Sequence, residues 1–215
     1  MQIFNLTKDS PVYTANAWYV TGTWKGLDDV NTLIDAGMDP AVVSRIAGMP
    51  SGLGKRKLDR IILTHNHSDH AGQVEALKAA YHAEVLAWSA HHRGVDRTLH
   101  DGEVIRIGDA LFETIHMPGH SQDSILLYCR EEGVLFAGDS PLVIRSADGS
   151  YEPAFLQVLE RLTRLPMECI YFGHGDPLTE HCGDVLRRSL ELARSHPDRS
   201  TRHTRSGHHE QGGKT

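Results

Sequence analysis

The chain has 215 residues, of which 40% are hydrophobic and 23% are charged. This length and composition suit one globular domain and exclude a fibrous or wholly disordered chain. Lys and Arg number 22 and Asp and Glu number 28, so the formal net charge is −6. A net acidic chain does not favour nucleic acid as the main partner. Histidine is unusually frequent, at 15 residues, which points toward a metal site.

Three features of the sequence predict a cytoplasmic protein that does not span a membrane. The three cysteines, Cys129, Cys169 and Cys182, are an odd number without CxxC spacing. Reduced thiols are therefore expected instead of a disulfide framework. The longest apolar runs fall far short of the roughly 20 residues that span a bilayer, and the first ten residues lack the hydrophobic stretch of a signal peptide.

Short strands are expected to alternate with helices along the chain. Runs of apolar, often β-branched residues predict strands at 2–6, 16–21, 30–35, 58–63, 84–87, 103–107, 110–116, 124–129, 133–138 and 168–172. Apolar residues spaced three and four apart predict helices from about residue 39 and at 69–80, 152–165 and 179–195. This mixture predicts an α/β domain with helices packed on sheets, and leaves open whether the strands form one sheet or two.

The composition changes at the end of the chain. Residues 197–215 contain no aliphatic or aromatic hydrophobic residue and no cysteine. Such a segment has no apolar surface to offset the entropy that ordering costs. We therefore expect a single domain over residues 1–196, followed by a polar, flexible tail over 197–215.

Residues 64–72 read THNHSDHAG and connect a predicted buried strand to a predicted helix. Alternate side chains of an extended segment point to the same side, so His65 and His67 can meet at one point. Asp69 and His70 follow at the turn into the helix and can face a second point nearby. Imidazole and carboxylate groups are ligands that zinc and iron accept. The segment therefore predicts a cluster of ligands for divalent metal ions.

Three further donors follow strand ends downstream. His120 lies in PGHS, Asp139 in AGDS and His174 in FGHGD. Each stands beside a glycine, where the backbone can turn sharply and approach closely. Strand ends are also where α/β sheets commonly build their sites. The pattern favours one site that collects donors from distant parts of the chain.

In order and spacing, these four motifs resemble the metallo-β-lactamase superfamily, with the motif set of its glyoxalase II-like members. The resemblance implies an αββα sandwich of two mixed β-sheets flanked by helices. It also implies two divalent metal ions, with zinc as the first expectation and iron or a mixed pair as alternatives. The implied ligands are His65, His67 and His120 for the first ion, Asp69, His70 and His174 for the second, and Asp139 as the bridge. Asp35, in LIDAG, matches the aspartate that orients a ligand histidine.

The resemblance further implies a hydrolase. Two metal ions about 3.5–4 Å apart can activate a water near neutral pH. The expected reaction is attack of a hydroxide, bridged by the two metals, on an ester, thioester, lactone or related bond of a small molecule. Asp139 is the expected bridging carboxylate, and Asp69 or a metal-bound water is the candidate proton donor to the leaving group.

Two other functions compete with the hydrolase. Persulfide dioxygenases of the same superfamily also carry an HxHxDH pattern and use one iron with a subset of the ligands. A non-catalytic metal-binding module is the third possibility, although such a module has no need to keep all seven ligands. Substrate choice is expected from four loops, which carry aromatic and cationic residues, at 22–29, 50–57, 88–98 and 142–153.

Overall fold

The computed structural model describes residues 1–24, 26–91, 94–147 and 149–195. The predicted tail at 197–215 lies outside the described residues. Among the helices of the described chain, none has the length and hydrophobicity that crossing a bilayer requires.

The first sheet is mixed. Its six strands follow one another in chain order, β1 to β6. The first three pair antiparallel and the later neighbours pair parallel. The strands are β1 (Gln2–Asn5), β2 (Trp18–Thr21), β3 (Thr32–Ile34), β4 (Arg60–Ile62), β5 (Glu84–Ala87) and β6 (Arg97–Thr98).

The second sheet is also mixed. Its order is β11-β10-β9-β8-β7, with antiparallel neighbours except for the parallel pair β10 and β11. The strands are β7 (Val104–Ile107), β8 (Ala110–His116), β9 (Ile125–Cys129), β10 (Val134–Gly138) and β11 (Cys169–Phe172).

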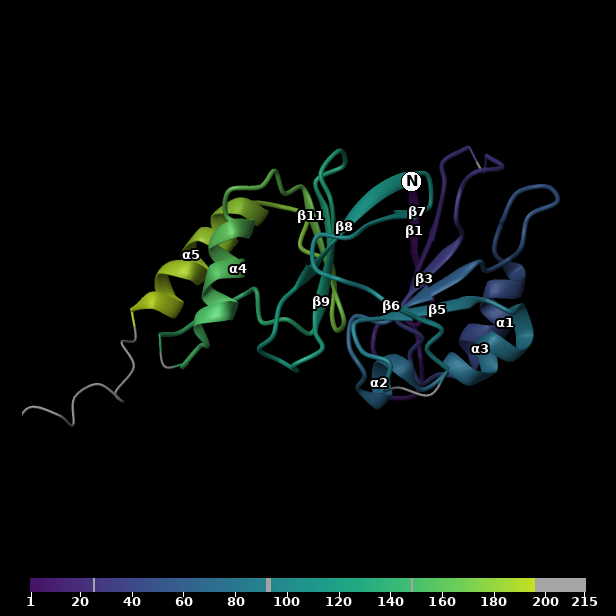
Figure 1. The fold of residues 1–215 in the computed structure, drawn as a ribbon, viewed down its shortest axis with the longest axis horizontal. Helices are drawn as coiled ribbons and strands as arrows, with labels where there is room; N and C mark the ends of the chain where they lie inside the picture. Colours follow the sequence, from purple (N-terminus) through teal and green to yellow (C-terminus); the bar gives the residue numbers. More distant parts are fainter. Residues whose placement is uncertain (25, 92–93, 148, 196–215) are drawn as a thin grey trace, which may run out of the picture.

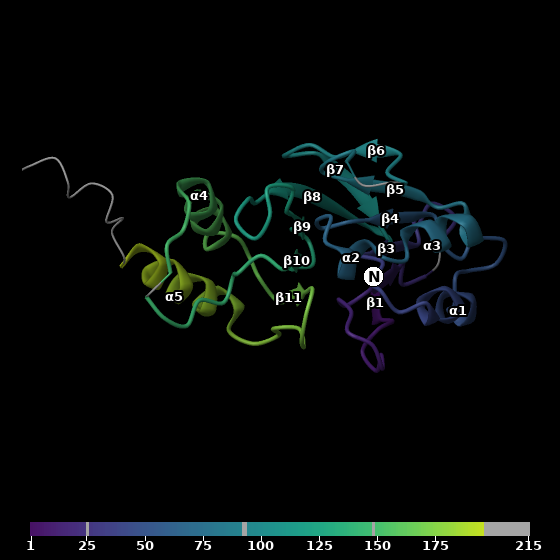
Figure 2. The ribbon, with the colours of Figure 1, turned by 90° about the horizontal axis from the view of Figure 1, so that it is seen from below.

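Helices cover the outer face of each sheet (Figures 1 and 2). Helices α1 (Ala41–Gly48) and α3 (Val74–Tyr81) pack on the first sheet through one apolar cluster. Helices α4 (Pro153–Leu162) and α5 (Cys182–Arg194) pack on the second sheet through another. A third cluster, which includes Val20, Ile62 and Phe112, fills the space between the sheets. The αββα sandwich of two mixed sheets is thus confirmed, and the fold question that strand propensity left open is answered.

Two elements differ from the sequence expectation. The helix expected at 69–80 is two helices, α2 (Ser68–Ala71) and α3. They separate because the backbone N–H of Gln73 donates to the Gly37 carbonyl at 3.0 Å and its side chain to the Met38 carbonyl at 2.8 Å. Strand β6 lies in a segment expected to be a loop. With only two residues it has too short a pattern to predict, and it forms by pairing with β5.

The ends of four strands meet at one edge of the sandwich. Asp35 follows β3, His65 lies three residues after β4, Asp139 follows β10, and His174 lies two residues after β11. Because β3 and β4 are parallel, and β10 and β11 are parallel, each pair ends on the same side. Helix α2 lies at this edge as well (Figure 1). This edge is where the predicted donors gather.

Candidate metal centre

The first group of donors consists of His65, His67 and His120, whose ligand atoms all lie within 4.8 Å of one another. The Nδ1 atom of His67 is 3.0 Å from Nε2 of His65 and 3.0 Å from Nε2 of His120. His65 and His67 come from the segment after β4, whereas His120 comes from the loop between β8 and β9. Three ring nitrogens from two sheets therefore face one point.

The second group consists of Asp69, His70, Asp139 and His174, again with ligand atoms within 4.8 Å of one another. Nε2 of His174 lies 3.1 Å from Oδ2 of Asp69. Nε2 of His70 lies 3.2 Å from Oδ1 of Asp139. Helix α2 carries Asp69 and His70, and strand ends of the other sheet carry Asp139 and His174.

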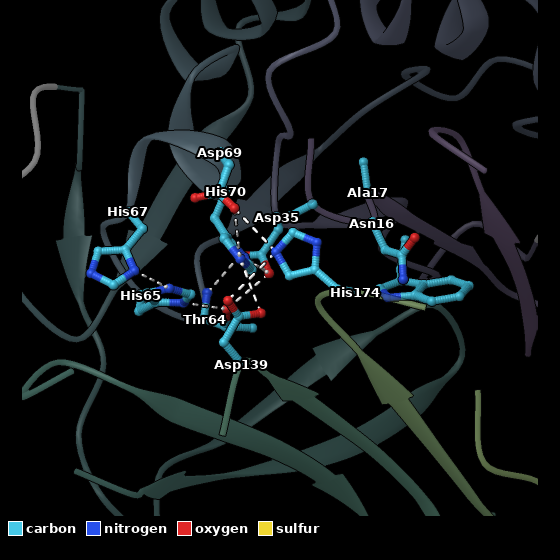
Figure 3. A network of polar contacts seen from close by, with 12 residues as sticks. Asn16, Ala17, Asp35, Thr64, His65, His67, Asp69, His70, Asp139 and His174 are labelled. Carbon is cyan, nitrogen blue, oxygen red and sulfur yellow. Dashed lines mark hydrogen bonds and ion pairs between the residues drawn. The ribbon is translucent and has the colours of Figure 1, made fainter. Parts of the chain in front are cut away.

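Asp139 belongs to the second group, where its carboxylate points toward His70 and His174 (Figure 3), and it also faces the first group. Its Oδ2 atom is 3.6 Å from Nε2 of His120 and 3.5 Å from Nε2 of His174. One carboxylate oxygen thus faces a histidine of each group. This is the position that a carboxylate needs in order to be shared by two ions.

Gly173 allows this close approach of side chains. A Cβ atom at this position would lie 2.1 Å from Oδ1 of Asp139 and 2.6 Å from Cε1 of His70. Both distances are well inside van der Waals contact, so any larger residue would displace a donor. Glycine is therefore required before His174 for steric reasons, which the sequence motif alone did not reveal.

Asp35 is buried beneath the second group and holds His70 in place. Its Oδ1 atom accepts the backbone N–H of Thr64 at 2.8 Å, and Oδ2 accepts the Thr64 hydroxyl at 2.8 Å. Oδ2 also lies 2.8 Å from Nδ1 of His70. The His70 ring therefore has Nδ1 on Asp35 and Nε2 directed at Asp139. The backbone of Asp35 is left-handed, with φ of 58°.

Burial and charge shift the titration of these groups. Burial lowers the pKa of His65 to about 4, with His70 acting in the same direction. Burial also opposes the charged form of His70, but the carboxylates of Asp35 and Asp139 outweigh it and raise that pKa to about 10. Burial opposes ionisation of Asp139, yet the neighbouring histidines, His70 first, lower its pKa to about 2. The two carboxylates therefore stabilise positive charge at His70, whereas burial keeps His65 neutral near pH 7.

The donor set fits divalent cations. Nε2 of His70 and Oδ1 of Asp139 are both buried, and neither has a hydrogen-bond partner among the described residues, although only 3.2 Å separates them. Buried polar atoms without partners are costly, and a cation between them would satisfy both. The seven donors are imidazole nitrogens and carboxylate oxygens, which both zinc and iron accept.

Only part of the predicted substrate loops lies near this centre. A pocket of about 280 Å³ beside His120 and Asp139 is lined by Tyr151 and Glu152 of the loop at 142–153. Trp88, from the loop at 88–98, lines a hollow that it shares with Asn66. The loops at 22–29 and 50–57 precede β3 and β4 and lie at the opposite edge of the sheet, so the expectation that they line the site is wrong (Figure 1).

Tyr13 also lies at the site, although no sequence motif predicts it there. Its ring stacks on His174, with the ring centroids 5.5 Å apart and the planes 20° from parallel. It precedes β2 in an irregular segment, far in sequence from every predicted donor. Only the fold brings it there.

Comparison with known proteins agrees with this arrangement. The sequence profile of the metallo-beta-lactamase superfamily matches residues 11–174. The chain belongs to the metallo-β-lactamase superfamily. A solved structure of this fold, ETHE1 from Myxococcus xanthus, superposes with a TM-score of 0.67 and 22% sequence identity, covering 90% of this chain and 88% of that one. Rubredoxin oxygen:oxidoreductase from Desulfovibrio gigas reaches a TM-score of 0.66 at 20% identity, covering 86% of this chain and 54% of that one.

Two of the curated relatives carry names of thioester hydrolases. Hydroxyacylglutathione hydrolase of Methylococcus capsulatus is 35% identical over 143 residues, which are 64% of this chain and 55% of the relative. Acyl-coenzyme A thioesterase MBLAC2 of Gallus gallus is 33% identical over 163 residues, with 58% of this chain and 57% of the relative covered. The chain thus spans about half the length of the curated relatives it matches.

Proposed function

We propose that the chain is a metal-dependent hydrolase of small-molecule thioesters, with two divalent ions held by the seven donors. The observation that carries the proposal is the position of Asp139, one oxygen of which faces a histidine of each donor group at about 3.5 Å. The names of the two relatives support a thioester as the bond that is cleaved. A cytoplasmic setting is part of the proposal, and the three unpaired cysteines agree with it.

Each donor group is proposed to hold one ion, except that Asp139 would serve both. His65, His67 and His120 would hold the first ion, Asp69, His70 and His174 would hold the second, and Asp139 would be shared. When bound, divalent ions polarise a carbonyl oxygen and activate water. Zinc is proposed for both positions, with iron or a mixed pair as the alternatives.

The surrounding residues are proposed to orient these donors and the substrate. Asp35 keeps Nε2 of His70 directed at Asp139. The pocket beside Asp139, with Tyr151 and Phe155 in its wall, offers about 280 Å³ for one arm of the substrate. Asp69, whose carboxylate lies beside the half-exposed His174, is proposed to accept the proton that the attacking water loses and to pass it to the departing group, with a metal-bound water as the alternative donor.

A thioester suits this centre better than an amide. A thiol has a pKa of about 8.5, so its anion leaves near neutral pH with little help from an acid. An amide nitrogen must be protonated before it leaves. Since the low pKa of Asp139 keeps its carboxylate ionised, Asp139 offers no proton, and the demand for one falls on Asp69 or a metal-bound water. A thioester needs less help from a proton donor than an amide does, and it is therefore the better substrate for this centre.

The test uses the full chain, depleted of metal and reloaded with zinc or with iron(II). A hydroxyacylglutathione and an acyl-coenzyme A are compared with esters, lactones and lactams, while metal ions per chain are counted. Thioester hydrolysis with two ions bound is expected. Oxygen uptake on glutathione persulfide with one iron per chain would transfer the assignment to the dioxygenase. Two bound ions with turnover of an ester, lactone or lactam but no thioester would contradict the thioester, and two bound ions with no turnover at all would favour a non-catalytic module.

A further inference from the structure

The rings of His70 and His174 are held differently. His70 is fully buried, and its Nδ1 atom is fixed by Asp35. The His174 side chain is 36% exposed. Across the described parts of the chain, no hydrogen bond reaches its Nδ1 atom, since its polar contacts are made by Nε2. Metal-binding histidines almost always have their second nitrogen fixed by such a bond. Any protein contact that orients the ring of His174 must therefore be of another kind.

The backbone around His174 does not supply this restraint by itself. Gly173 and Gly175 flank the histidine, and Gly175 has a φ of 79°. Glycine has access to more backbone conformations than any other residue. The position of His174 therefore depends on contacts from outside its own segment.

Asn16 supplies the contacts that fix the backbone of this segment. Its N–H donates to the Gly173 carbonyl at 2.6 Å. Its side-chain amide donates to the carbonyls of Phe172 at 3.0 Å and Gly175 at 2.8 Å. One residue from the other sheet's half of the molecule thus binds three backbone carbonyls on either side of the histidine.

Tyr13 supplies the contact that orients the ring. The residue is 77% exposed, yet one face of its ring stacks on the His174 imidazole. Two residues further on, the N–H of Ala15 donates to the backbone carbonyl of Asp69 at 3.2 Å. The segment at 13–16 therefore touches both Asp69 and His174, the pair whose side chains lie 3.1 Å apart.

We propose that Tyr13 is a positioning residue that holds the His174 imidazole toward Asp69 and so sets how tightly the second metal ion is retained. A flat ring stacked on the imidazole restricts rotation of that ring about its Cβ–Cγ bond, which is the motion that a hydrogen bond at Nδ1 prevents elsewhere. The inference rests on the proposed function only in requiring a divalent ion at the second donor group.

The test compares Tyr13→Ala and Tyr13→Phe with the unaltered chain. Trp24→Ala is the matched control, because Trp24 is an aromatic residue that is 91% exposed at the opposite edge of the sheet. Each protein is loaded with zinc or cobalt(II) alone and titrated with a chelator, while native mass spectrometry counts the ions bound. Tyr13→Ala is expected to lose its second ion at a chelator concentration about tenfold lower, as for loss of other groups that orient metal ligands. Tyr13→Phe and Trp24→Ala are expected to match the unaltered chain.

Retention of both ions by Tyr13→Ala, as tightly as in the unaltered chain, would overturn the inference. A change in KM with both ions retained would do the same, because it would make Tyr13 a substrate contact. Should the alanine variant not fold, Tyr13→Leu takes its place, because leucine keeps the bulk without the flat ring. It too is expected to lose the second ion more easily than the unaltered chain, and equal retention would overturn the inference. The count of ions needs no substrate, so absence of thioesterase activity in the unaltered chain would refute the proposed function without touching that count.

Discussion

Single atoms at the centre show what each carboxylate contributes. Asp139 lies within 3.6 Å of three histidine Nε2 atoms, those of His70, His120 and His174. Asp35 contacts one of these histidines from behind and is shielded from solvent. Asp139 therefore faces the proposed ions directly, whereas Asp35 acts through His70. Substitution by asparagine separates the two roles, because it removes charge and keeps shape.

Asp139→Asn is expected to lower kcat/KM for a thioester more than 100-fold, since loss of groups that merely orient metal ligands already costs about 10–100-fold. The neutral amide would also reduce the number of ions per chain below two. Activity assays and metal analysis check both expectations. Asp176→Asn makes the same change at an exposed residue two positions after His174 and should leave both quantities unchanged. Near-normal turnover by Asp139→Asn would contradict the shared-ligand role.

Asp35→Asn is expected to destabilise the fold itself. Asparagine tolerates the left-handed backbone at this position, so the substitution tests the charge and not the conformation. Its amide would place a donor against the donors of Thr64 and His70 and cost about 1–3 kcal/mol in the free energy of unfolding. Urea unfolding in the presence of a chelator measures this without any contribution from metal. An unchanged unfolding midpoint would show that the contacts of Asp35 add no stability.

At the scale of elements, the break between α2 and α3 decides where the donors point. Helix α2 ends at Ala71 because Gln73 bonds to the segment after β3 instead of continuing the helix. The short helix is thereby free to direct Asp69 and His70 into the centre, while α3 packs Val74 and Leu77 against the sheet. Gly72 lies at the junction.

Gly72→Ala is expected to destabilise the protein by about 1–3 kcal/mol through crowding. The added Cβ would lie 2.8 Å from the Ser68 carbonyl oxygen and 3.2 Å from the Gly37 carbonyl oxygen. Gly48→Ala is the matched control, because Gly48 ends α1 and a Cβ there meets no atom within 4 Å. It should be neutral or stabilise by up to about 1 kcal/mol, since alanine favours helix. Chemical denaturation of both variants measures the change in the free energy of unfolding, which should fall for Gly72→Ala and not for Gly48→Ala. Equal changes in the two variants would refute the crowding.

At the scale of the whole molecule, the donors come from both halves of the sandwich. The segments after β4 and in α2 belong to the first sheet's half, and the loop after β8 and the ends of β10 and β11 belong to the second. Ions held at this edge would therefore join the two sheets, in addition to the apolar cluster that already packs between them.

Added zinc is accordingly expected to raise the melting temperature of the metal-free chain by about 10 °C. A ligand at about 1,000 times its Kd contributes about 4 kcal/mol, and each kcal/mol moves the midpoint by about 2–4 °C at this size. Thermal unfolding with zinc and with EDTA measures the difference. The Asp139→Asn variant should show a much smaller shift. An equal shift in the variant would place the stabilising ions elsewhere.

The order of elements and the identity of the donors were readable from local patterns. Strands such as 84–87 and 110–116 match β5 and β8 residue for residue, because a run of apolar residues between turn signals is a local property. The segment at 64–72 and the three downstream motifs stand out because few sequences place imidazoles and carboxylates beside glycine at strand ends. Their roles as metal ligands stay predictions that ion counting will test.

The sequence by itself therefore determined the α/β character of the chain and, through a family resemblance, the sandwich and the candidate donors. Tertiary structure alone decided which loops reach the centre, where the helix after His67 divides, and that Tyr13 lies on His174. The physical reason is the range of the interactions. Hydrophobic period and turn chemistry act between near neighbours, whereas the Gln73 bonds and the Tyr13 stack join residues that lie 35 to 161 positions apart and exist only after the sheets have packed.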